Sequence, residues 1–278
     1  MTRRNRAKPK SSVADKIKDL TELYSPTIIT LYGKPGTGKT TLASTAPKPQ
    51  LIIDVKDKGT DSAKSASLKH GEIGVYPLEG FDDIYEVYDY IKENPGKYKS
   101  VVIDHVTSLQ DKAMDKVKEQ ENKTEISQRM FGQASGYMKE VISLYKDLTD
   151  EGIIPIFIAQ DRTDTEGDGE DQLAPEVGPA MMPSLARTLG ASSRVIGNTF
   201  LQEKVEKTGD MKVLRTIEYR LRLGPNPYYL TKVTRPNGTP CPDYIVNPTY
   251  EDIEKIIKGE WVEPKAKPTT RTRKRRRA

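Results

Sequence analysis

The chain has 278 residues, of which 35% are hydrophobic and 31% charged, which suits one folded α/β core with extensions or two small domains. Its longest apolar run, residues 153–159, is far shorter than the roughly 20 residues of a membrane span, and no apolar run follows the basic N-terminus as a secretory signal requires. A single cysteine, Cys241, excludes a disulfide framework within the chain, fits a reducing cytosol and favours a cytoplasmic location. Cys241, His70 and His105 form no metal-ligand pattern.

Positive charge is concentrated at the two ends of the chain. Residues 1–12 carry a formal +5 and residues 261–278 carry +7, whereas the whole chain carries +5, which leaves −7 for residues 13–260. We therefore expect a basic arm (1–12) and a basic tail (261–278), both disordered, around an acidic domain (13–260). Nucleic-acid contact is the preferred interpretation, and solubility or flexibility is the alternative. Such contact would be independent of base sequence and sensitive to salt.

Apolar spacing predicts alternating elements in the first half of the chain. Pro47 is expected to end the short helix that follows the first strand, because proline disrupts the interior of a helix. The expected elements are a helix over 13–23, a strand over 27–32, a Gly-rich loop with its short helix, a strand over 51–55, a helix over 81–91 and a strand over 101–103.

The second half begins in the same way and then changes character. Residues 161–172 contain six acids, one arginine and two glycines, which predicts a mobile loop. Thr208-Gly209-Asp210 lies between two strand-like runs and indicates a β-hairpin. Strands alternating with helices imply a mostly parallel sheet covered on both faces. The expected elements are helices over 108–118, 126–148, 183–189 and 250–257, and strands over 153–159, 194–205, 213–223 and 228–234.

The Gly-rich loop at residues 33–40 satisfies the pattern G-x-x-x-x-G-K-[ST] of a P-loop. Its glycines let the backbone curl so that N–H groups face a phosphate cavity. Lys39 is expected to reach the β- and γ-phosphates, and the Thr40 hydroxyl to ligate Mg²⁺. The pattern predicts binding of a nucleoside triphosphate, ATP being the expected one. The expected binding residues are Gly33, Lys34, Pro35, Gly36, Thr37, Gly38, Lys39, Thr40 and Thr41.

Asp104 closes the apolar strand over 101–103, which is the Walker B pattern. We expect Asp104 to hold Mg²⁺ through water and to pair with the Thr40 hydroxyl. Hydrolysis also needs a group that orients or deprotonates water. Asp57 is the candidate base, although it could be a solvated loop residue. Gln160, directly after the strand over 153–159, is the candidate sensor of the γ-phosphate, although it could simply begin a loop.

The order of five segments, 33–40, 47–54, 101–104, 156–160 and 178–185, resembles that of phage-encoded RecA-like ATPases. These are AAA-domain nucleotide-binding proteins that include single-strand annealing proteins, and the similarity covers about residues 25–258. The resemblance implies a RecA-like P-loop fold, here with a C-terminal β-hairpin extension. It also implies ATP binding, oligomers, and action on single-stranded DNA in recombination or annealing. The basic residues expected to contact that DNA are Arg3, Arg4, Arg6, Arg271, Arg273, Lys274, Arg275, Arg276 and Arg277.

The resemblance also implies a late Lys-x-Arg pair that reaches a neighbouring subunit's ATP. The matching residues here are Lys232 and Arg235, one position further apart than in that pattern. On a strand this spacing places them on opposite faces, so only one is expected to reach the phosphate, and Lys232 is preferred.

RecA-like enzymes usually have a catalytic glutamate after the second strand, where this chain has Lys56. Either Asp57 substitutes for that glutamate or hydrolysis is slow. Two functions therefore stay open: a DNA-stimulated ATPase, and a nucleotide-gated DNA-binding scaffold with little turnover. A P-loop kinase is disfavoured because the acidic loop holds one arginine, Arg162, in place of an Arg-rich lid. An AAA+ loader is disfavoured because His105, and not a second acid, follows Asp104.

Overall fold

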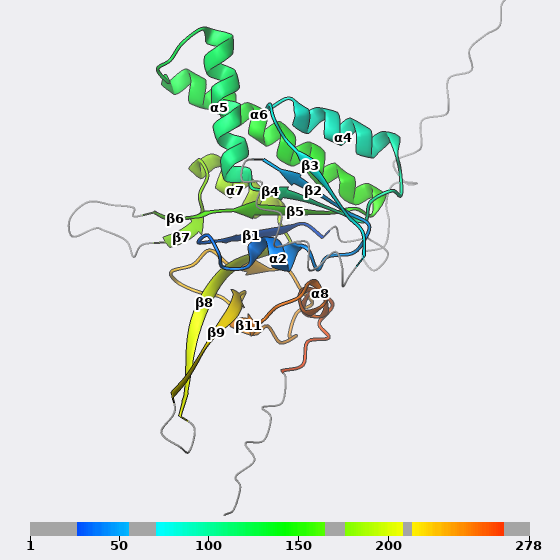
Figure 1. Cartoon of the computed structure of the whole chain (residues 1–278), viewed down its shortest axis with the longest axis vertical. Helices are drawn as coiled ribbons and strands as arrows, with labels where there is room; N and C mark the ends of the chain where they lie inside the picture. Colours follow the sequence, from blue (N-terminus) through cyan, green and yellow to red (C-terminus); the bar gives the residue numbers. More distant parts are fainter. Residues whose placement is uncertain (1–26, 56–70, 165–175, 208–212, 264–278) are drawn as a thin grey trace, which may run out of the picture.

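The computed structural model describes residues 27–55, 71–164, 176–207 and 213–263. Within them a nine-stranded sheet has the order β11-β9-β8-β1-β5-β4-β2-β3, with β10 paired to β8 (Figure 1). A separate two-stranded sheet joins β6 and β7. The strands are β1 (Ile29–Gly33), β2 (Gln50–Asp54), β3 (Ile73–Pro77), β4 (Ser100–Asp104), β5 (Ile154–Ala159), β6 (Asp161–Asp164), β7 (Glu176–Pro179), β8 (Val195–Lys207), β9 (Val213–Arg222), β10 (Lys232–Val233) and β11 (Tyr244–Val246).

Helices cover both faces of the large sheet. Figure 1 shows α4, α5 and α6 over one face and α2 and α8 over the other. Buried residues form a separate core on each side, and Leu185 and Leu189 of α7 belong to the core under α4–α6. The helices are α2 (Lys39–Ala43), α4 (Asp83–Glu93), α5 (Val106–Glu121), α6 (Gln128–Asp147), the 3-10 helix η2 (Leu148–Glu151), α7 (Pro183–Ser192) and α8 (Tyr250–Lys258).

The central strands are buried on both faces, which explains their continuous apolar sequences. All residues of β1, β2 and β5 are buried, and β1 runs parallel to both β5 and β8. In this register Tyr32 pairs with Ala159, and Asp54 pairs with Asp104. The carboxyl ends of these parallel strands therefore meet along one edge, which is where ligands bind in such sheets.

The expected α/β fold, with a mostly parallel sheet and a hairpin, is confirmed. Strands β8 and β9 pair antiparallel from Asn198↔Arg222 to Lys207↔Val213, and Figure 1 shows the hairpin extending away from the body. Trp261 was expected to start the tail, but it is only 8% exposed and packs in the core that contains α8.

Some sequence expectations were wrong in detail. Asp161–Asp164 was expected within a loop but forms β6, because its backbone pairs with β7. The strand expected over 228–234 is reduced to β10, since only Lys232 and Val233 pair with β8. Strands β3, β7 and β11 were not anticipated.

Several expected features lie outside the described residues: the basic arm, the helix over 13–23, Asp57, the rest of the acidic loop, the turn at 208–210 and the basic tail from 264. Among the residues that are described, no helix is long and apolar enough to cross a membrane.

Candidate functional site

The P-loop connects the end of β1 to the start of α2, and its conformation depends on its glycines. Gly33 has φ 154°, and a Cβ there would lie 2.3 Å from the Thr199 carbonyl oxygen of β8. Gly38 has φ 86°, a left-handed conformation that favours glycine. The Thr37 hydroxyl lies 2.6 Å from the Thr199 hydroxyl and donates to the Lys34 carbonyl at 2.7 Å. These contacts hold the loop against β8.

The Lys39 ammonium lies inside the curve of this loop. Its Nζ donates to the carbonyl oxygens of Gly33 at 2.7 Å and Lys34 at 2.8 Å, and the residue is only 7% exposed. A buried ammonium bound to neutral carbonyls is a strong donor for an anion, because charge-assisted hydrogen bonds to phosphate are stronger than those to a carbonyl. The geometry is therefore suited to a phosphate group in the loop.

The Thr40 hydroxyl donates to Asp104 Oδ2 at 2.6 Å, so the expected pairing of these residues is present. Burial raises the pKa of Asp104, and the Thr40 hydrogen bond partly opposes that shift. A nearby cation would favour the ionised carboxylate. Across the described residues no three His, Cys, Asp or Glu side chains gather into a metal cluster. Two oxygen ligands nevertheless fit Mg²⁺, which usually takes one or two protein oxygens together with phosphate and water.

Gln160 directly follows β5, whose last pair with β1 is Tyr32↔Ala159, so it lies at the same edge of the sheet as the start of the P-loop. Its backbone is fixed, because its N–H donates to Thr107 Oγ1 at 3.1 Å and its carbonyl accepts from Ala180 N–H at 2.8 Å. Its side-chain Oε1 is buried without a hydrogen-bond partner in the described part of the chain. A fixed backbone with an unsatisfied amide oxygen suits a residue that binds water or phosphate-bound water.

His105 has a structural role beside Asp104. It is the N-cap of α5, where its Nδ1 accepts from Ser108 N–H at 3.0 Å. This bond satisfies one of the free N–H groups at the start of the helix.

The structure does not bring Lys232 and Arg235 to the P-loop of their own chain. Lys232 Nζ donates to the carbonyls of Gly190 at 3.0 Å and Ala191 at 3.3 Å, near the end of α7. Arg235 Nε donates to the Thr239 carbonyl at 3.0 Å. Within one chain both side chains therefore bind backbone carbonyls and not the P-loop.

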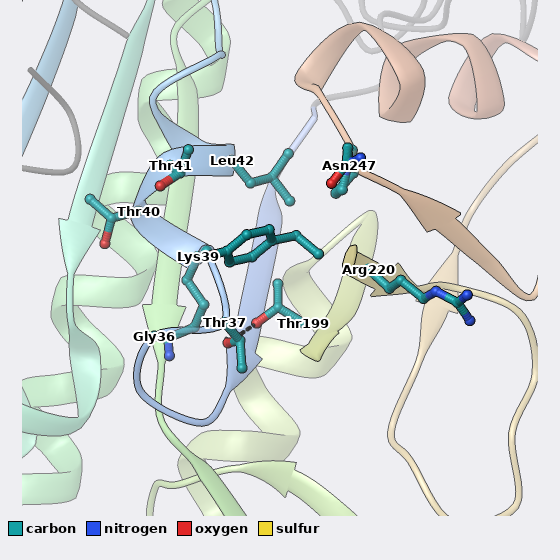
Figure 2. A pocket seen from close by; sticks show the side chains of 12 residues that line it. Gly36, Thr37, Lys39, Thr40, Thr41, Leu42, Thr199, Arg220 and Asn247 are labelled. Carbon is teal, nitrogen blue, oxygen red and sulfur yellow. Dashed lines mark hydrogen bonds between the residues drawn. The ribbon is translucent and has the colours of Figure 1, made fainter. Parts of the chain in front are cut away.

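A cavity of about 610 Å³ opens beside the P-loop (Figure 2). Besides residues 36–42, it is lined by β8, β9 and the segment before α8, none of which the sequence patterns marked as part of the site. These additional lining residues are Thr199, Tyr219, Arg220, Asn247 and Pro248. A local motif could not identify them, because they lie about 160 to 210 residues from the P-loop in sequence.

Lys39 inside a glycine loop, and Thr40 bonded to a strand-end aspartate, define a P-loop nucleotide-binding protein. A family model described as an AAA domain matches residues 25–219, which is 195 of the 278 residues. The chain belongs to this AAA-domain family, whose members bind nucleotides, typically with a divalent metal. A search of curated proteins returned no match.

Proposed function

We propose that the protein is an ATPase that binds Mg²⁺-ATP and acts on single-stranded DNA as an oligomer, in recombination or strand annealing of phage type. The observation that carries the nucleotide part is the joint placement of Lys39, Thr40 and Asp104. Lys39 would bind the β- and γ-phosphates, and Thr40 and Asp104 would hold Mg²⁺ between them and the phosphates. When bound, Mg²⁺ would neutralise charge on the phosphate oxygens during hydrolysis.

Activation of the attacking water is assigned to Gln160 and Asp57. The Oε1 of Gln160 has no hydrogen-bond partner among the described residues and lies just beyond the end of the β1–β5 pairing, which supports a part in orienting water near the γ-phosphate. Asp57 lies three residues beyond Asp54, the end of β2, which pairs with Asp104 of β4. This proximity along the chain supports Asp57 as the base.

The oligomer and DNA contacts are proposed from the resemblance and from charge. Lys232 or Arg235 would bind the γ-phosphate of a neighbouring subunit, so that ATP stabilises the assembly and hydrolysis loosens it. Phosphates of single-stranded DNA would bind the basic residues near both chain ends.

The second candidate function is a nucleotide-gated DNA-binding scaffold with little turnover. Lys56, at the position where RecA-like enzymes have a glutamate, favours it. A bound nucleotide would then select one oligomeric state without being consumed.

Steady-state ATP hydrolysis, measured with and without single-stranded DNA at low and moderate salt, separates the two functions. The ATPase predicts several turnovers per subunit, stimulated by DNA and absent in Lys39→Ala. Binding of ATP without turnover under every condition would overturn the enzyme and leave the scaffold.

A further inference from the structure

The cavity extends from the P-loop toward β8 and β9, whereas Asp104 and Gln160 lie on the other side of β1. In the sheet order, β5 and β4 with Gln160 and Asp104 follow β1 on one side, whereas β8, β9 and β11 follow it on the other. Figure 2 shows Thr40 and Asn247 on opposite sides of the loop. If the γ-phosphate meets Asp104 and Gln160, as the proposed function requires, the nucleoside must extend toward β8 and β9.

Tyr219 of β9 forms the near wall of this cavity. Its ring contacts the loop directly, because a Cβ built on Gly38 would lie 3.0 Å from Tyr219 Cδ1. The side chain is 45% exposed, so one part of the ring packs on the loop while another faces the cavity. Its neighbour on the same face of β9, Leu221, is buried and anchors the strand in the core. A flat ring next to a phosphate site is a surface on which a base can stack.

Asn247 and Pro248 form the far wall, and hydrogen bonds fix their position. Asn247 N–H donates to the Tyr219 carbonyl at 2.6 Å, and the residue adopts φ 48°. Two residues after Pro248, Tyr250 N–H donates to Thr45 Oγ1 at 2.7 Å, which ties the start of α8 to the end of the α2 segment. Figure 2 shows Asn247 and Leu42 together at this end of the pocket. The wall is therefore held in a defined position relative to the P-loop.

Arg220 also borders the cavity, but its guanidinium is engaged elsewhere. It forms an ion pair with Glu218 at 2.7 Å and lies 4.4 Å from the centre of the Tyr244 ring. Figure 2 shows its side chain directed away from Lys39 and Thr37. Among the lining residues outside the P-loop segment, Tyr219 offers a flat ring to a nucleoside and Asn247 offers a side-chain amide.

We propose that these two residues form the nucleoside subsite, in which Tyr219 stacks on the base and Asn247 reads an adenine edge. A side-chain amide offers one donor and one acceptor, which match N7 and the N6 amino group of adenine. Guanine presents two acceptors, O6 and N7, at the same edge, so it leaves the amide carbonyl unmatched. The subsite thus selects adenine nucleotides, and this inference rests on the proposed nucleotide site.

Equilibrium binding of ATP, GTP and inorganic tripolyphosphate, each with Mg²⁺, tests the subsite. Tyr219→Ala is expected to weaken ATP binding about tenfold and to leave tripolyphosphate binding unchanged, because the substitution removes the stacking surface for the base and keeps Lys39 and the P-loop backbone that would bind the phosphates. Tyr219→Phe keeps the ring and should bind ATP as the wild type does. Ile217→Ala, an exposed position two residues along the same face of β9, is the matched control and should also be neutral. Asn247→Ala is expected to narrow the preference for ATP over GTP.

The outcomes distinguish this inference from the proposed function. If Tyr219→Ala binds ATP as tightly as the wild type, or weakens tripolyphosphate as much as ATP, the subsite is overturned while the phosphate site stands. If the wild-type protein binds neither ATP nor tripolyphosphate, the proposed function itself fails.

Discussion

Replacing Gly33 by alanine is the sharpest test of how the P-loop is built. An alanine Cβ at this position would lie 2.3 Å from the backbone oxygen of Thr199 and 2.6 Å from its hydroxyl. The hydroxyl can rotate away, but the backbone oxygen belongs to β8, which pairs with β1 at Gly33↔Thr199. The substitution must therefore push two paired central strands apart.

Gly36→Ala supplies the matched comparison. Gly36 also has a positive φ, 77°, but a Cβ there would meet nothing within 4 Å. It should cost only the left-handed strain of a non-glycine residue, about 1–2 kcal/mol. Gly33→Ala adds overpacking of about 1–3 kcal/mol to a comparable backbone strain, so a loss of about 2–5 kcal/mol is expected.

Urea unfolding of the two variants beside the wild type measures this difference, with ATP binding as the second readout. Adding Thr199→Ala to Gly33→Ala should not restore stability, because the nearest clashing atom is in the backbone. Equal unfolding free energies for Gly33→Ala and Gly36→Ala would refute the close approach of β1 and β8 at the P-loop.

Three further predictions concern metal binding, hydrolysis and DNA. Burial raises the pKa of Asp104, so ionising this side chain destabilises the folded state. The free energy of unfolding therefore falls as pH rises above about 4, the ordinary pKa of the side chain in the unfolded chain. Asp104→Asn should therefore raise the unfolding free energy at pH 7 in EDTA while weakening Mg²⁺-dependent ATP binding; lower stability in EDTA would contradict this. Gln160→Leu should preserve folding and ATP binding but slow hydrolysis at least tenfold, since the buried Oε1 has no partner within the described residues; an unchanged single-turnover rate would exclude its role. Removing residues 264–278 should weaken binding of single-stranded DNA and flatten its dependence on salt, by about 0.7 in the log–log slope for each DNA phosphate that the tail neutralises; an unchanged slope in a titration from low to moderate salt would exclude the tail.

Much of the fold could be predicted because the central strands are buried on both faces. Their apolar runs are continuous, and the strand-end Asp104 and the P-loop sit in the expected order. The strands that were missed are short or at the edges: β3 has exposed positions, and β11 has three residues with only Ile245 buried. Edge strands of this kind are defined by pairing partners far away in sequence, which local periodicity does not report.

The phosphate end of the site could be predicted and the nucleoside end could not. Residues 33–40 form a contiguous motif, because one loop holds most of the groups proposed to bind phosphate. Tyr219 and Asn247 reach the same cavity only through strand pairing, in which Asn247 N–H bonds to the Tyr219 carbonyl. An exposed tyrosine in a hairpin and an asparagine before a helix have no distinguishing pattern in a single sequence.

Calorimetric titration of the protein with ATP, with Mg²⁺ and with EDTA, tests the central claim most directly. The account predicts saturable binding at one site per subunit that is strengthened by Mg²⁺ and abolished in Lys39→Ala, although that variant keeps its cooperative thermal unfolding. ATP binding of equal affinity in the wild type and in folded Lys39→Ala would show that the nucleotide does not occupy the P-loop.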